Sequence, residues 1–313
     1  IKTFDVLSNP EFLAEGTAIK DLLKPDRVLI GGENQLAMDA LSEIYSGWVK
    51  KEKILFTNIW SSELAKLTAN AFLAQRISSI NSISALCEAT GADIREVARA
   101  IGSDSRIGSK FLDSGPGFGG SCFKKDILNL VYLSEYFGLP EVAAFWNEVV
   151  NINSWHQQRI SKLIAKKLFG TLSGKKITIL GFAFKANTND TRESASIVIC
   201  QDLIEEGAHL IIHDPKVSAK QMENDINNIS TNNKNTSSFE GTWEYIEDLD
   251  KAFFKSDAVL IATEWEEYKK IDWDKVSNEM RSPAWVFDAR SIVDPAKVTS
   301  TGLKLWRVGN GAQ

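Results

Sequence analysis

The residues best suited to covalent chemistry lie in one short segment, where a cysteine follows a run of glycines. Residues 117–126 read GFGGSCFKKD. Glycines let the backbone approach a ligand closely, and a helix beginning near Cys122 would place the thiol at its positive end. There the helix dipole and Lys125 both favour the thiolate, while Asp126 lies one helical turn away. The pattern predicts a nucleophile beside a carboxylate that guides hydrolysis, and a buried structural cysteine is the alternative.

A second segment could supply an acid–base group. Residues 8–16 read SNPEFLAEG and follow a predicted strand. In α/β sheets, ligands bind beyond the carboxyl ends of the strands. Glu11 and Glu15 would face one site if this segment is helical. The alternative is a helix start, where acidic residues are favoured by the dipole.

A third segment could supply a cation. Residues 63–70 read ELAKLTAN, so that Lys66 and Asn70 share a helix face with Glu63. A lysine among apolar residues could stabilise a developing oxyanion. A surface pair between Glu63 and Lys66 is the alternative.

A fourth segment, residues 181–192 (GFAFKANTNDTR), follows a predicted strand at 176–180. This is where a Rossmann unit carries its glycine-rich phosphate loop, but only Gly181 is present here. Lys185 and Arg192 could bind phosphate by charge instead. Asp214 ends the next strand and loosely matches the acidic residue that binds a ribose. An ordinary βα turn is the alternative.

The elements that must position these segments fall into three parts. Residues 1–58 read as strand, helix and strand, with strands at 27–32 and 53–58 and a helix at about 34–45. The first eight residues also read as a strand. Because this part is too small for an α/β domain, we expect the chain to begin in the middle of one.

Residues 59–169 read as a helical domain. Long helices are expected at 60–90 and from Pro140 to Phe169, with a shorter one at 93–101 and another starting near Cys122. The irregular run 106–120 separates them. Two long helices flanking a glycine-rich loop favour a dimer spine, and a self-contained bundle is the alternative.

Residues 170–313 alternate strands with helices, which predicts a doubly wound parallel sheet. A helical pattern covers 192–206, and the Asn/Ser/Thr-rich stretch 224–238 is expected to be a solvated loop. The strands are expected at 176–180, 210–213, 258–262, 285–287 and 303–308.

Composition excludes several classes of function. The 313 residues are 43% apolar and carry a net charge of −5, so nucleic acid and membrane surfaces are poor partners. No apolar stretch is long enough to span a membrane. Three cysteines indicate a reducing compartment, which we take as the cytoplasm, and core packing is expected for Cys87 and Cys200. His209 and His213 lie on one predicted strand, roughly 13 Å apart, so no metal site is expected.

Together these segments resemble the UDP-glucose 6-dehydrogenase family, and its animal-type members most. The resemblance rests on residues 9–16, 63–76, 117–126 and 181–194, and it runs the length of the chain. It implies three domains: the end of an N-terminal NAD-binding Rossmann domain (1–58), a central helical dimerisation domain (59–169) and a UDP-sugar-binding domain (170–313). The segment that carries the dinucleotide fingerprint in the family is missing from this chain.

The resemblance also implies the reaction and its residues. UDP-glucose would be oxidised twice at C6 by NAD, through a thiohemiacetal and then a thioester on Cys122, to UDP-glucuronate. Glu11 would act as acid or base, Lys66 would stabilise the oxyanion, and Asn70 and Asp126 would assist. The substrate-binding residues would be Phe12, Leu13, Ala14, Phe118, Gly119, Phe184, Lys185, Arg290 and, from a neighbouring subunit, Arg106. Glu15, Lys125 and Arg192 would contact NAD.

Two rival interpretations stay open at this point. The chain could be a non-catalytic fragment that binds a UDP-sugar and dimerises. It could also belong to a sister enzyme that acts on GDP-mannose or UDP-N-acetyl-mannosamine. The family implies a dimer built on the long helix, with hexamers among animal-type members.

Overall fold

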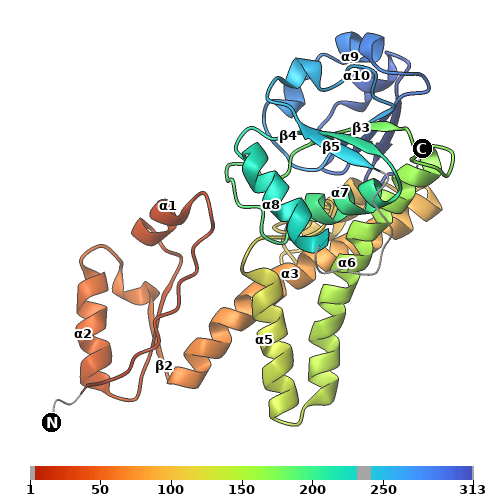
Figure 1. The fold of residues 1–313 in the computed structure, drawn as a ribbon. Coiled ribbons are helices and arrows are strands. Elements are labelled where there is room, and N and C mark those ends of the chain that lie inside the picture. The colour runs from red at the N-terminus through yellow and green to blue at the C-terminus, as the bar shows by residue number, and fades with distance from the viewer. Residues whose placement is uncertain (1–3, 231–240, 312–313) are drawn as a thin grey trace. The chain divides into compact units, whose positions relative to one another are not determined.

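The structure, a computed structural model, describes residues 4–230 and 241–311. The chain divides into two compact units. The first contains residues up to Phe72 together with Lys125–Trp146, and the second contains Leu73–Lys124 and Asn147 onward. Figure 1 shows the order of the elements along the chain.

The first unit contains a parallel βαβ motif. Strand β1 (Val28–Gly31) pairs with β2 (Ile54–Thr57), and α2 (Gln35–Ser46) connects them. Asn34 caps α2 by accepting a hydrogen bond from the Leu36 N–H. The small helices of this unit are α1 (Ala18–Leu23) and the 3₁₀ turn η1 (Lys51–Lys53). The strands and the helix predicted for residues 27–58 are thus confirmed.

The strand predicted for the first eight residues is wrong over the residues that the structure describes. Residues 4–7 have no regular structure, and Ser8 forms only an isolated antiparallel bridge with Gly31. Phe4 and Val6 are 84% and 63% exposed. Their alternation therefore faces no core, although it looked like that of a half-buried strand.

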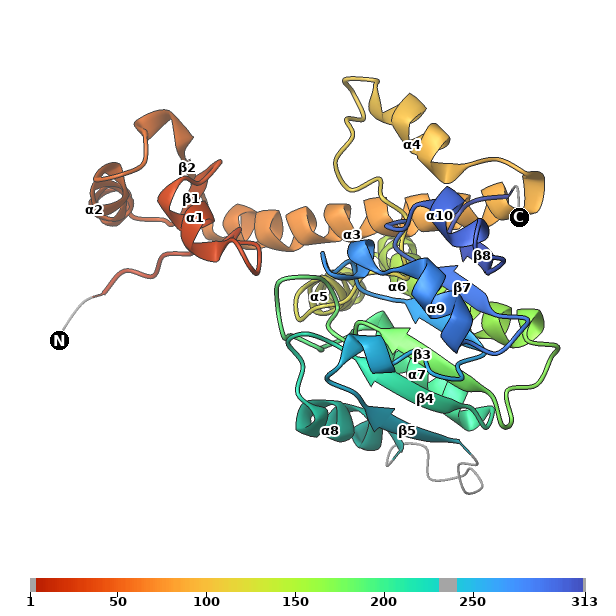
Figure 2. The same cartoon turned by 90° about the horizontal axis from the view of Figure 1, so that it is seen from above.

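Long helices follow, and their predicted positions are confirmed. Helix α3 (Ile59–Thr90) is unbroken, as Figure 2 shows, and α4 (Ile94–Gly102) is capped by Asp93. Helix α5 (Phe123–Tyr136) starts directly after Cys122, and α6 (Pro140–Lys167) follows it. Helix α6 ends at Lys167, before Phe169, which adopts a positive φ of 71°.

The second unit contains a six-stranded, wholly parallel sheet with the order β5-β4-β3-β6-β7-β8. Its strands are β3 (Lys176–Leu180), β4 (His209–His213), β5 (Thr242–Tyr245), β6 (Ala258–Ile261), β7 (Trp285–Asp288) and β8 (Lys304–Arg307). The strand order reverses between β3 and β6. In sheets of this kind the ligand lies beyond the carboxyl ends of the strands at that point.

Helices cover both faces of this sheet (Figure 1). On one side lie α7 (Ala195–Glu205) and α8 (Ala219–Ser230), and on the other lie α9 (Trp273–Glu279) and α10 (Pro295–Thr299). Short 3₁₀ turns η2 (Leu249–Lys251) and η3 (Tyr268–Lys270) complete the unit. The prediction of a doubly wound parallel sheet is confirmed, and edge strand β5 was missed.

The loop predicted for residues 224–238 is wrong up to Ser230, where α8 ends. Met222 and Ile226 are four residues apart and buried, so this polar helix has one apolar face. Residues 231–238 lie outside the described residues. Polar composition alone therefore hid an amphipathic helix.

Glu88 near the end of α3 joins that helix to the end of the sheet. Its carboxylate accepts two hydrogen bonds from Arg159, at 2.8 and 3.0 Å, and one from the Gly309 N–H at 2.8 Å. Nearby, Arg307 pairs with Asp93 at 2.9 Å. The segment after β8 is thereby fixed to α3 and α4 within the second unit.

In the described part of the chain, no helix combines the length and the apolar character needed to cross a membrane.

Candidate active site

In the first unit, Glu11 and Lys66 meet although 55 positions separate them. Lys66 Nζ donates to Glu11 Oε1 at 2.8 Å, and the Leu13 N–H donates to Glu11 Oε2 at 2.6 Å. Glu63 instead accepts a hydrogen bond from Ser8 at 2.5 Å. The cation is therefore directed to Glu11, and the surface pair between Glu63 and Lys66 is not formed.

The ion pair changes the acidity of Glu11. Burial by itself would raise the pKa of this carboxyl group. The hydrogen bonds from Lys66 and Leu13 and the positive charges of Lys66 and Lys125 outweigh burial, so the pKa lies below its ordinary value. Glu11 is consequently a carboxylate at neutral pH.

The segment around Glu11 forms neither a helix nor a strand. Residues 9–14 have no helix, and Glu15 stands exposed in the following turn, so Glu11 and Glu15 do not share a helix face. A shared site for these two residues required a helix over this segment, and that condition is not met. Backbone hydrogen bonds to side chains hold the segment instead, including that from the Ala14 N–H to Asp21 at 3.0 Å.

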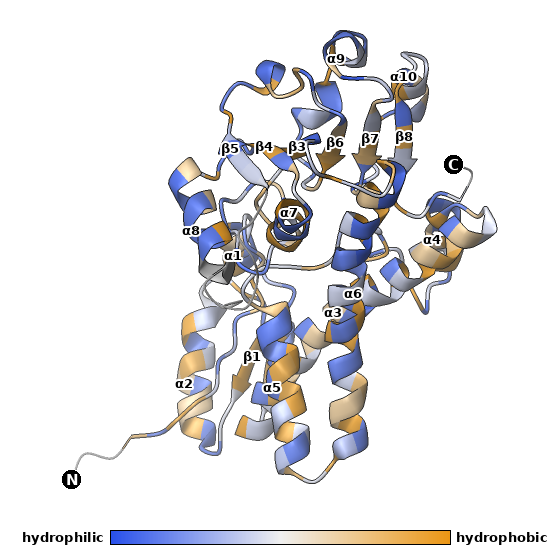
Figure 3. Cartoon of the chain, turned by 45° about the vertical axis from the view of Figure 1, so that its right-hand side comes forward, coloured by the Kyte–Doolittle hydropathy of each residue, from blue (hydrophilic) through white to orange (hydrophobic). Residues whose placement is uncertain are grey.

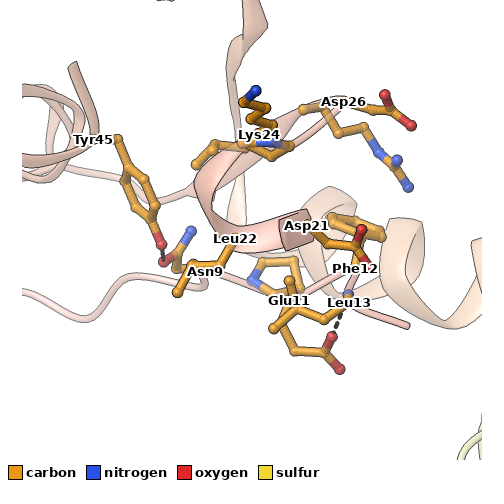
Figure 4. A pocket seen from close by; sticks show the side chains of 13 residues that line it. Asn9, Glu11, Phe12, Leu13, Asp21, Leu22, Lys24, Asp26 and Tyr45 are labelled. Carbon is orange, nitrogen blue, oxygen red and sulfur yellow. Dashed lines mark hydrogen bonds between the residues drawn. The ribbon is translucent and has the colours of Figure 1, made fainter. Parts of the chain in front are cut away.

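A cavity of about 260 Å³ opens beside this segment (Figure 4). Glu11, Phe12 and Leu13 line one part of it. The Arg27 guanidinium lies 3.7 Å from the centre of the Phe12 ring, which is a cation–π contact. The Tyr45 hydroxyl donates to Asn9 at 2.7 Å and closes another side.

Asn70 and Asp126 form a second contact in the first unit. Asn70 Nδ2 donates to Asp126 Oδ2 at 2.6 Å, and the Asp126 residue is only 5% exposed. Lys125 is exposed, and its Nζ lies 3.8 Å from Asp126 Oδ1. Asp126 also lies in the first turn of α5, where the dipole stabilises a negative charge.

In the second unit, Cys122 differs from the other cysteines. It is half-buried, with Sγ 3.5 Å from the Ser121 hydroxyl, and it directly precedes α5. Cys87 and Cys200 are buried, and burial raises the pKa of both thiols. The prediction of core packing for Cys87 and Cys200 is therefore confirmed.

The glycine-rich loop packs closely against the turn that follows β3. A Cβ on Gly119 would lie 2.4 Å from the Glu193 carbonyl oxygen, and one on Gly120 would lie 3.0 Å from the Phe184 ring. Lys124 pairs with the Glu193 carboxylate at 2.8 Å. Glycine is needed at both loop positions because no side chain fits between these two segments.

Phe184 and Arg290 meet at the carboxyl end of the sheet. Arg290 donates to the carbonyl oxygens of Phe184 and Ala262, at 3.0 and 2.8 Å, and its Nε lies 3.1 Å from Glu264. Lys185 Nζ lies 5.3 Å from the centre of the Phe184 ring. These residues follow β3, β6 and β7, so they surround the point where the strand order reverses.

Asp214 does not suit the ribose-binding role suggested for it. It is buried, and its carboxylate accepts hydrogen bonds from the Phe182, Ala183, Lys216 and Val217 N–H groups and from the Trp265 indole. These five donors occupy both oxygens. Asp214 therefore holds the turn that carries Phe184 and Lys185, and the ribose assignment is wrong.

Two arginines that were predicted to bind ligands pair with neighbouring carboxylates. Arg192 contacts Asp190 at 2.6 Å, and Arg106 contacts Asp104 at 2.6 Å. The Arg106 side chain is 86% exposed.

The predicted residues thus form two sets, one in each unit. The first unit holds Glu11, Phe12, Leu13, Ala14, Glu15, Lys66, Asn70, Lys125 and Asp126, and the second holds Arg106, Phe118, Gly119, Cys122, Phe184, Lys185, Arg192 and Arg290. The Phe118 ring is buried against Phe123, with centroids 5.9 Å apart.

Sequence reasoning missed Asn81, Asn153 and His156, which hold the glycine-rich loop; only their polar nature on otherwise apolar helix faces could have pointed to them.

The described residues fit the end of a dinucleotide site but not its phosphate loop. The letters of the fingerprint G-x-G-x-x-G occur at Gly115, Gly117 and Gly120, yet no strand precedes them and Gly117 packs on α6. At the carboxyl end of β2, however, the buried Thr57 hydroxyl has no hydrogen-bond partner. This free group lies where a parallel sheet presents polar atoms to a dinucleotide. Within residues 4–230 and 241–311, no group of three or more His, Cys, Asp or Glu side chains could hold a metal ion.

Comparison with known proteins agrees with this architecture. Three profiles of the UDP-glucose/GDP-mannose dehydrogenase family match: the NAD binding domain at residues 2–49, the central domain at 60–155 and the UDP binding domain at 178–295. The chain therefore belongs to the UDP-glucose/GDP-mannose dehydrogenase family.

Individual relatives narrow the comparison. The chain is similar to UDP-glucose 6-dehydrogenase of Drosophila melanogaster, with 53% identity over 99% of this chain and 66% of that protein. It is 56% identical to the Bos taurus UDP-glucose 6-dehydrogenase over 92% of this chain and 59% of the relative. A solved UDP-glucose dehydrogenase from Pyrobaculum islandicum superposes with a TM-score of 0.81 at 33% identity, covering 98% of this chain and 64% of that one. The chain thus spans about three fifths to two thirds of the length of these relatives.

Proposed function

We propose that this chain is the greater part of an NAD-dependent UDP-glucose 6-dehydrogenase, which oxidises C6 of UDP-glucose twice to give UDP-glucuronate. The observation that carries the proposal is the hydrogen bond between Lys66 and Glu11, which joins two distant segments into one acid–base pair. The similarity to UDP-glucose 6-dehydrogenases supports the choice of substrate. The NAD-binding profile at residues 2–49 supports NAD as the cofactor.

Cys122 is proposed as the covalent nucleophile. Its thiolate adds to the C6 aldehyde and gives a thiohemiacetal, which becomes a thioester after the second oxidation. Water then attacks the thioester, the C–S bond breaks, and the thiolate leaves with release of the carboxylate. NAD, when bound, accepts one hydride at each oxidation. The half-buried position of Cys122, directly before α5, supports this role because the thiol is accessible and lies at a helix start.

Glu11 and Lys66 are proposed to handle protons and charge. As a carboxylate, Glu11 can accept a proton from the attacking water. The Lys66 ammonium can donate a hydrogen bond to the oxygen on C6 as negative charge develops there. Their 2.8 Å contact supports the pairing, because each orients the other before substrate binds.

Asn70 and Asp126 are proposed to orient the substrate and the attacking water. Their 2.6 Å hydrogen bond uses Asp126 Oδ2, so Asp126 Oδ1 can accept a hydrogen bond from substrate or water. Cys122 and Asp126 are four residues apart around the start of α5, which supports a shared task in hydrolysis.

The remaining residues are proposed to bind ligands. Substrate would contact Phe12, Leu13, Ala14, Phe118, Gly119, Phe184, Lys185, Arg290 and the Arg106 of a neighbouring subunit. The turn after β3 supports this, because it lies at the point where the strand order reverses. NAD would be held by Glu15, Lys125 and Arg192, with the Thr57 hydroxyl as a free polar group.

A homodimer is proposed from an apolar face in the first unit, and a hexamer of the whole enzyme is proposed from the resemblance to animal-type members. This apolar face consists of exposed side chains on the start of α3, on α5, on the connection between α5 and α6, and on the start of α6; Figure 3 shows the apolar residues of α5 in orange. Monomers rarely leave so much apolar surface in water. Its members are Trp60, Leu64, Phe72, Leu128, Tyr132, Tyr136, Phe137, Leu139, Val142 and Phe145.

The domain boundaries are proposed as 1–58, 59–169 and 170–313. A cytoplasmic location is proposed from the three unpaired cysteines.

The proposal is tested by the substitution Cys122→Ser in the enzyme that carries this chain, assayed with UDP-glucose and NAD. NADH formation and UDP-glucuronate are measured together, with Cys87→Ala as the matched control because that thiol is buried. We expect Cys122→Ser to abolish steady formation of UDP-glucuronate and Cys87→Ala to preserve it. Unchanged UDP-glucuronate production by Cys122→Ser would refute the covalent role. Binding of UDP-glucose without any oxidation by the unaltered protein would favour the non-catalytic interpretation.

A further inference from the structure

Asn153, on the inner face of α6, holds the glycine-rich loop by its backbone. Its Oδ1 accepts a hydrogen bond from the Phe118 N–H at 2.8 Å, and its Nδ2 donates to the Phe118 carbonyl at 3.1 Å. Asn153 is 6% exposed. One buried amide therefore satisfies both backbone groups of one loop residue, as a neighbouring strand would do in a sheet.

A second pair of buried side chains holds the loop three residues earlier. The Gly115 N–H donates to Asn81 Oδ1 at 3.0 Å, and the Gly115 carbonyl accepts from His156 Nε2 at 2.8 Å. Asn81 comes from α3 and His156 from α6. The loop thus has no regular structure, yet side chains fix its polar groups at two separate positions.

Steric contacts hold the same loop from both sides. Gly117 lies so close to α6 that a Cβ would be 2.9 Å from Asn153 Oδ1. On the other side, the Gly120 N–H donates to the Arg192 carbonyl at 2.8 Å. The loop is therefore confined between α6 and the turn after β3.

The consequence concerns Cys122. Only Gly119, Gly120 and Ser121 separate it from Phe118, so a shift of the Phe118 backbone moves the thiol as well. We propose that Asn153 is a positioning residue for Cys122: its two hydrogen bonds set the place of the nucleophile relative to the C6 carbon. The inference rests on the proposed function, because it assumes that Cys122 is the nucleophile.

The test compares three variants in the intact enzyme. Asn153→Asp keeps the shape and the acceptor but removes the Asn153 donor to the Phe118 carbonyl, which keeps only the longer hydrogen bond from Gln157 Nε2 at 3.4 Å. Asn153→Ala removes both Asn153 groups. Asn151→Ala is the matched control, because Asn151 is exposed on the same helix. Melting temperature establishes that each variant folds, and Asn153→Asp serves as the test if Asn153→Ala does not fold.

The readouts are kcat and KM for UDP-glucose and the rate at which iodoacetamide alkylates Cys122. We expect Asn153→Asp and Asn153→Ala to lower kcat on the order of 10- to 100-fold, a larger change than that in KM. We expect the alkylation rate to change at least about threefold. Asn151→Ala should match the unaltered enzyme in all three. A folded Asn153 variant with unaltered kcat and alkylation rate would overturn the proposal.

The alkylation rate separates this inference from the proposed function. If Cys122→Ser leaves UDP-glucuronate production unchanged, the proposed function fails. A change of alkylation in the Asn153 variants would still show that Asn153 positions the thiol. If Cys122→Ser is inactive and both readouts of the Asn153 variants are normal, only the positioning role fails.

Discussion

Asn70 donates a 2.6 Å hydrogen bond to Asp126, and this contact joins α3 to α5 within the first unit. Without it, the partner that remains for this buried carboxylate among the described residues is Lys125, whose Nζ lies 3.8 Å away. Leaving a buried polar group unpaired costs about 1–3 kcal/mol. The contact therefore contributes to stability and fixes the direction of the Asp126 carboxylate.

Separating these two tasks gives the first prediction. Asp126→Asn keeps the volume and can still accept from Asn70, so we expect a loss of stability of less than about 1.5 kcal/mol. Loss of the negative charge should slow hydrolysis, so that a thioester on Cys122 accumulates and is detected by mass spectrometry of the intact protein. Asp39→Asn, on the exposed face of α2, is the control. Hydrolysis at the normal rate in Asp126→Asn would remove Asp126 from the reaction.

The ion pair between Glu11 and Lys66 gives a second prediction. Burial raises the pKa of Glu11, and the hydrogen bond and charge of Lys66 lower it. In Lys66→Ala the effect of burial should therefore be less compensated. We expect the Glu11 carboxyl group to titrate at higher pH in Lys66→Ala than in the unaltered protein. Carbon-13 NMR of labelled glutamate measures this directly.

The direction for stability follows from the same shift. Because the pKa of Glu11 is lowered by folding, its stabilising contribution is present above the unfolded value of 4.5 and is lost as the pH falls through the folded value. Lys66→Ala should reduce that contribution, because the Leu13 N–H and Lys125 still lower the pKa. Lys24→Ala, in the wall of the same cavity, should leave the titration of Glu11 unchanged; an equal shift in both variants would contradict a specific role for Lys66.

His156 gives a third prediction. Burial, together with the positive charge of Arg159, lowers its pKa to about 4 from 6.5. Between these values the unfolded chain binds a proton that the folded protein does not, so stability falls as the pH drops from 6.5 to 4. A shift of this size corresponds to about 3 kcal/mol. Burial also lowers the pKa of His213, which therefore acts in the same direction.

The substitution His156→Gln should flatten this dependence, since glutamine does not titrate and can still donate to Gly115. Urea unfolding at neutral pH and at about pH 5 measures the difference in the free energy of unfolding. His209→Gln is the control, because the His209 side chain, at the start of β4, is 40% exposed. An unchanged slope in His156→Gln would assign the acid sensitivity to other groups.

The apolar face of the first unit gives a fourth prediction. Tyr136→Glu and Phe145→Glu place charges on exposed members of that face, so we expect dissociation of the dimer with little loss of folded structure. Sedimentation velocity measures the mass of the assembly. Ile19→Glu places the same charge on an exposed residue of α1 outside the face. If all three variants sediment alike, the face does not mediate assembly.

The parallel sheet could be predicted from sequence because its central strands are continuous apolar runs, such as Val259–Ile261 in β6. Edge strand β5 lacks such an apolar run, because only its alternate residues are partly buried and the others are exposed. The role of Asp214 could not be predicted. An aspartate that ends a strand can accept from a ribose or from backbone N–H groups, and only the closure of the turn decides between them.

The residues of the candidate site could be predicted from the sequence, but the contacts between them could not. Glu11 and Lys66 were singled out separately, while their direct contact depends on where a segment without helix or strand meets α3. The polar nature of Asn153 was its one signal, and a polar residue in a long helix does not by itself indicate which face is buried. Its importance follows only from the unpaired backbone of the loop that it meets.

The contact of Glu88 with Arg159 and Gly309 has a consequence for local unfolding. These bonds tie the end of α3 to the segment after β8, although more than 200 positions separate them in the chain. The end of α3 cannot fray without breaking them, so it should open only together with the last strand. Hydrogen exchange would then show these two segments as one cooperative unit, with equal opening free energies.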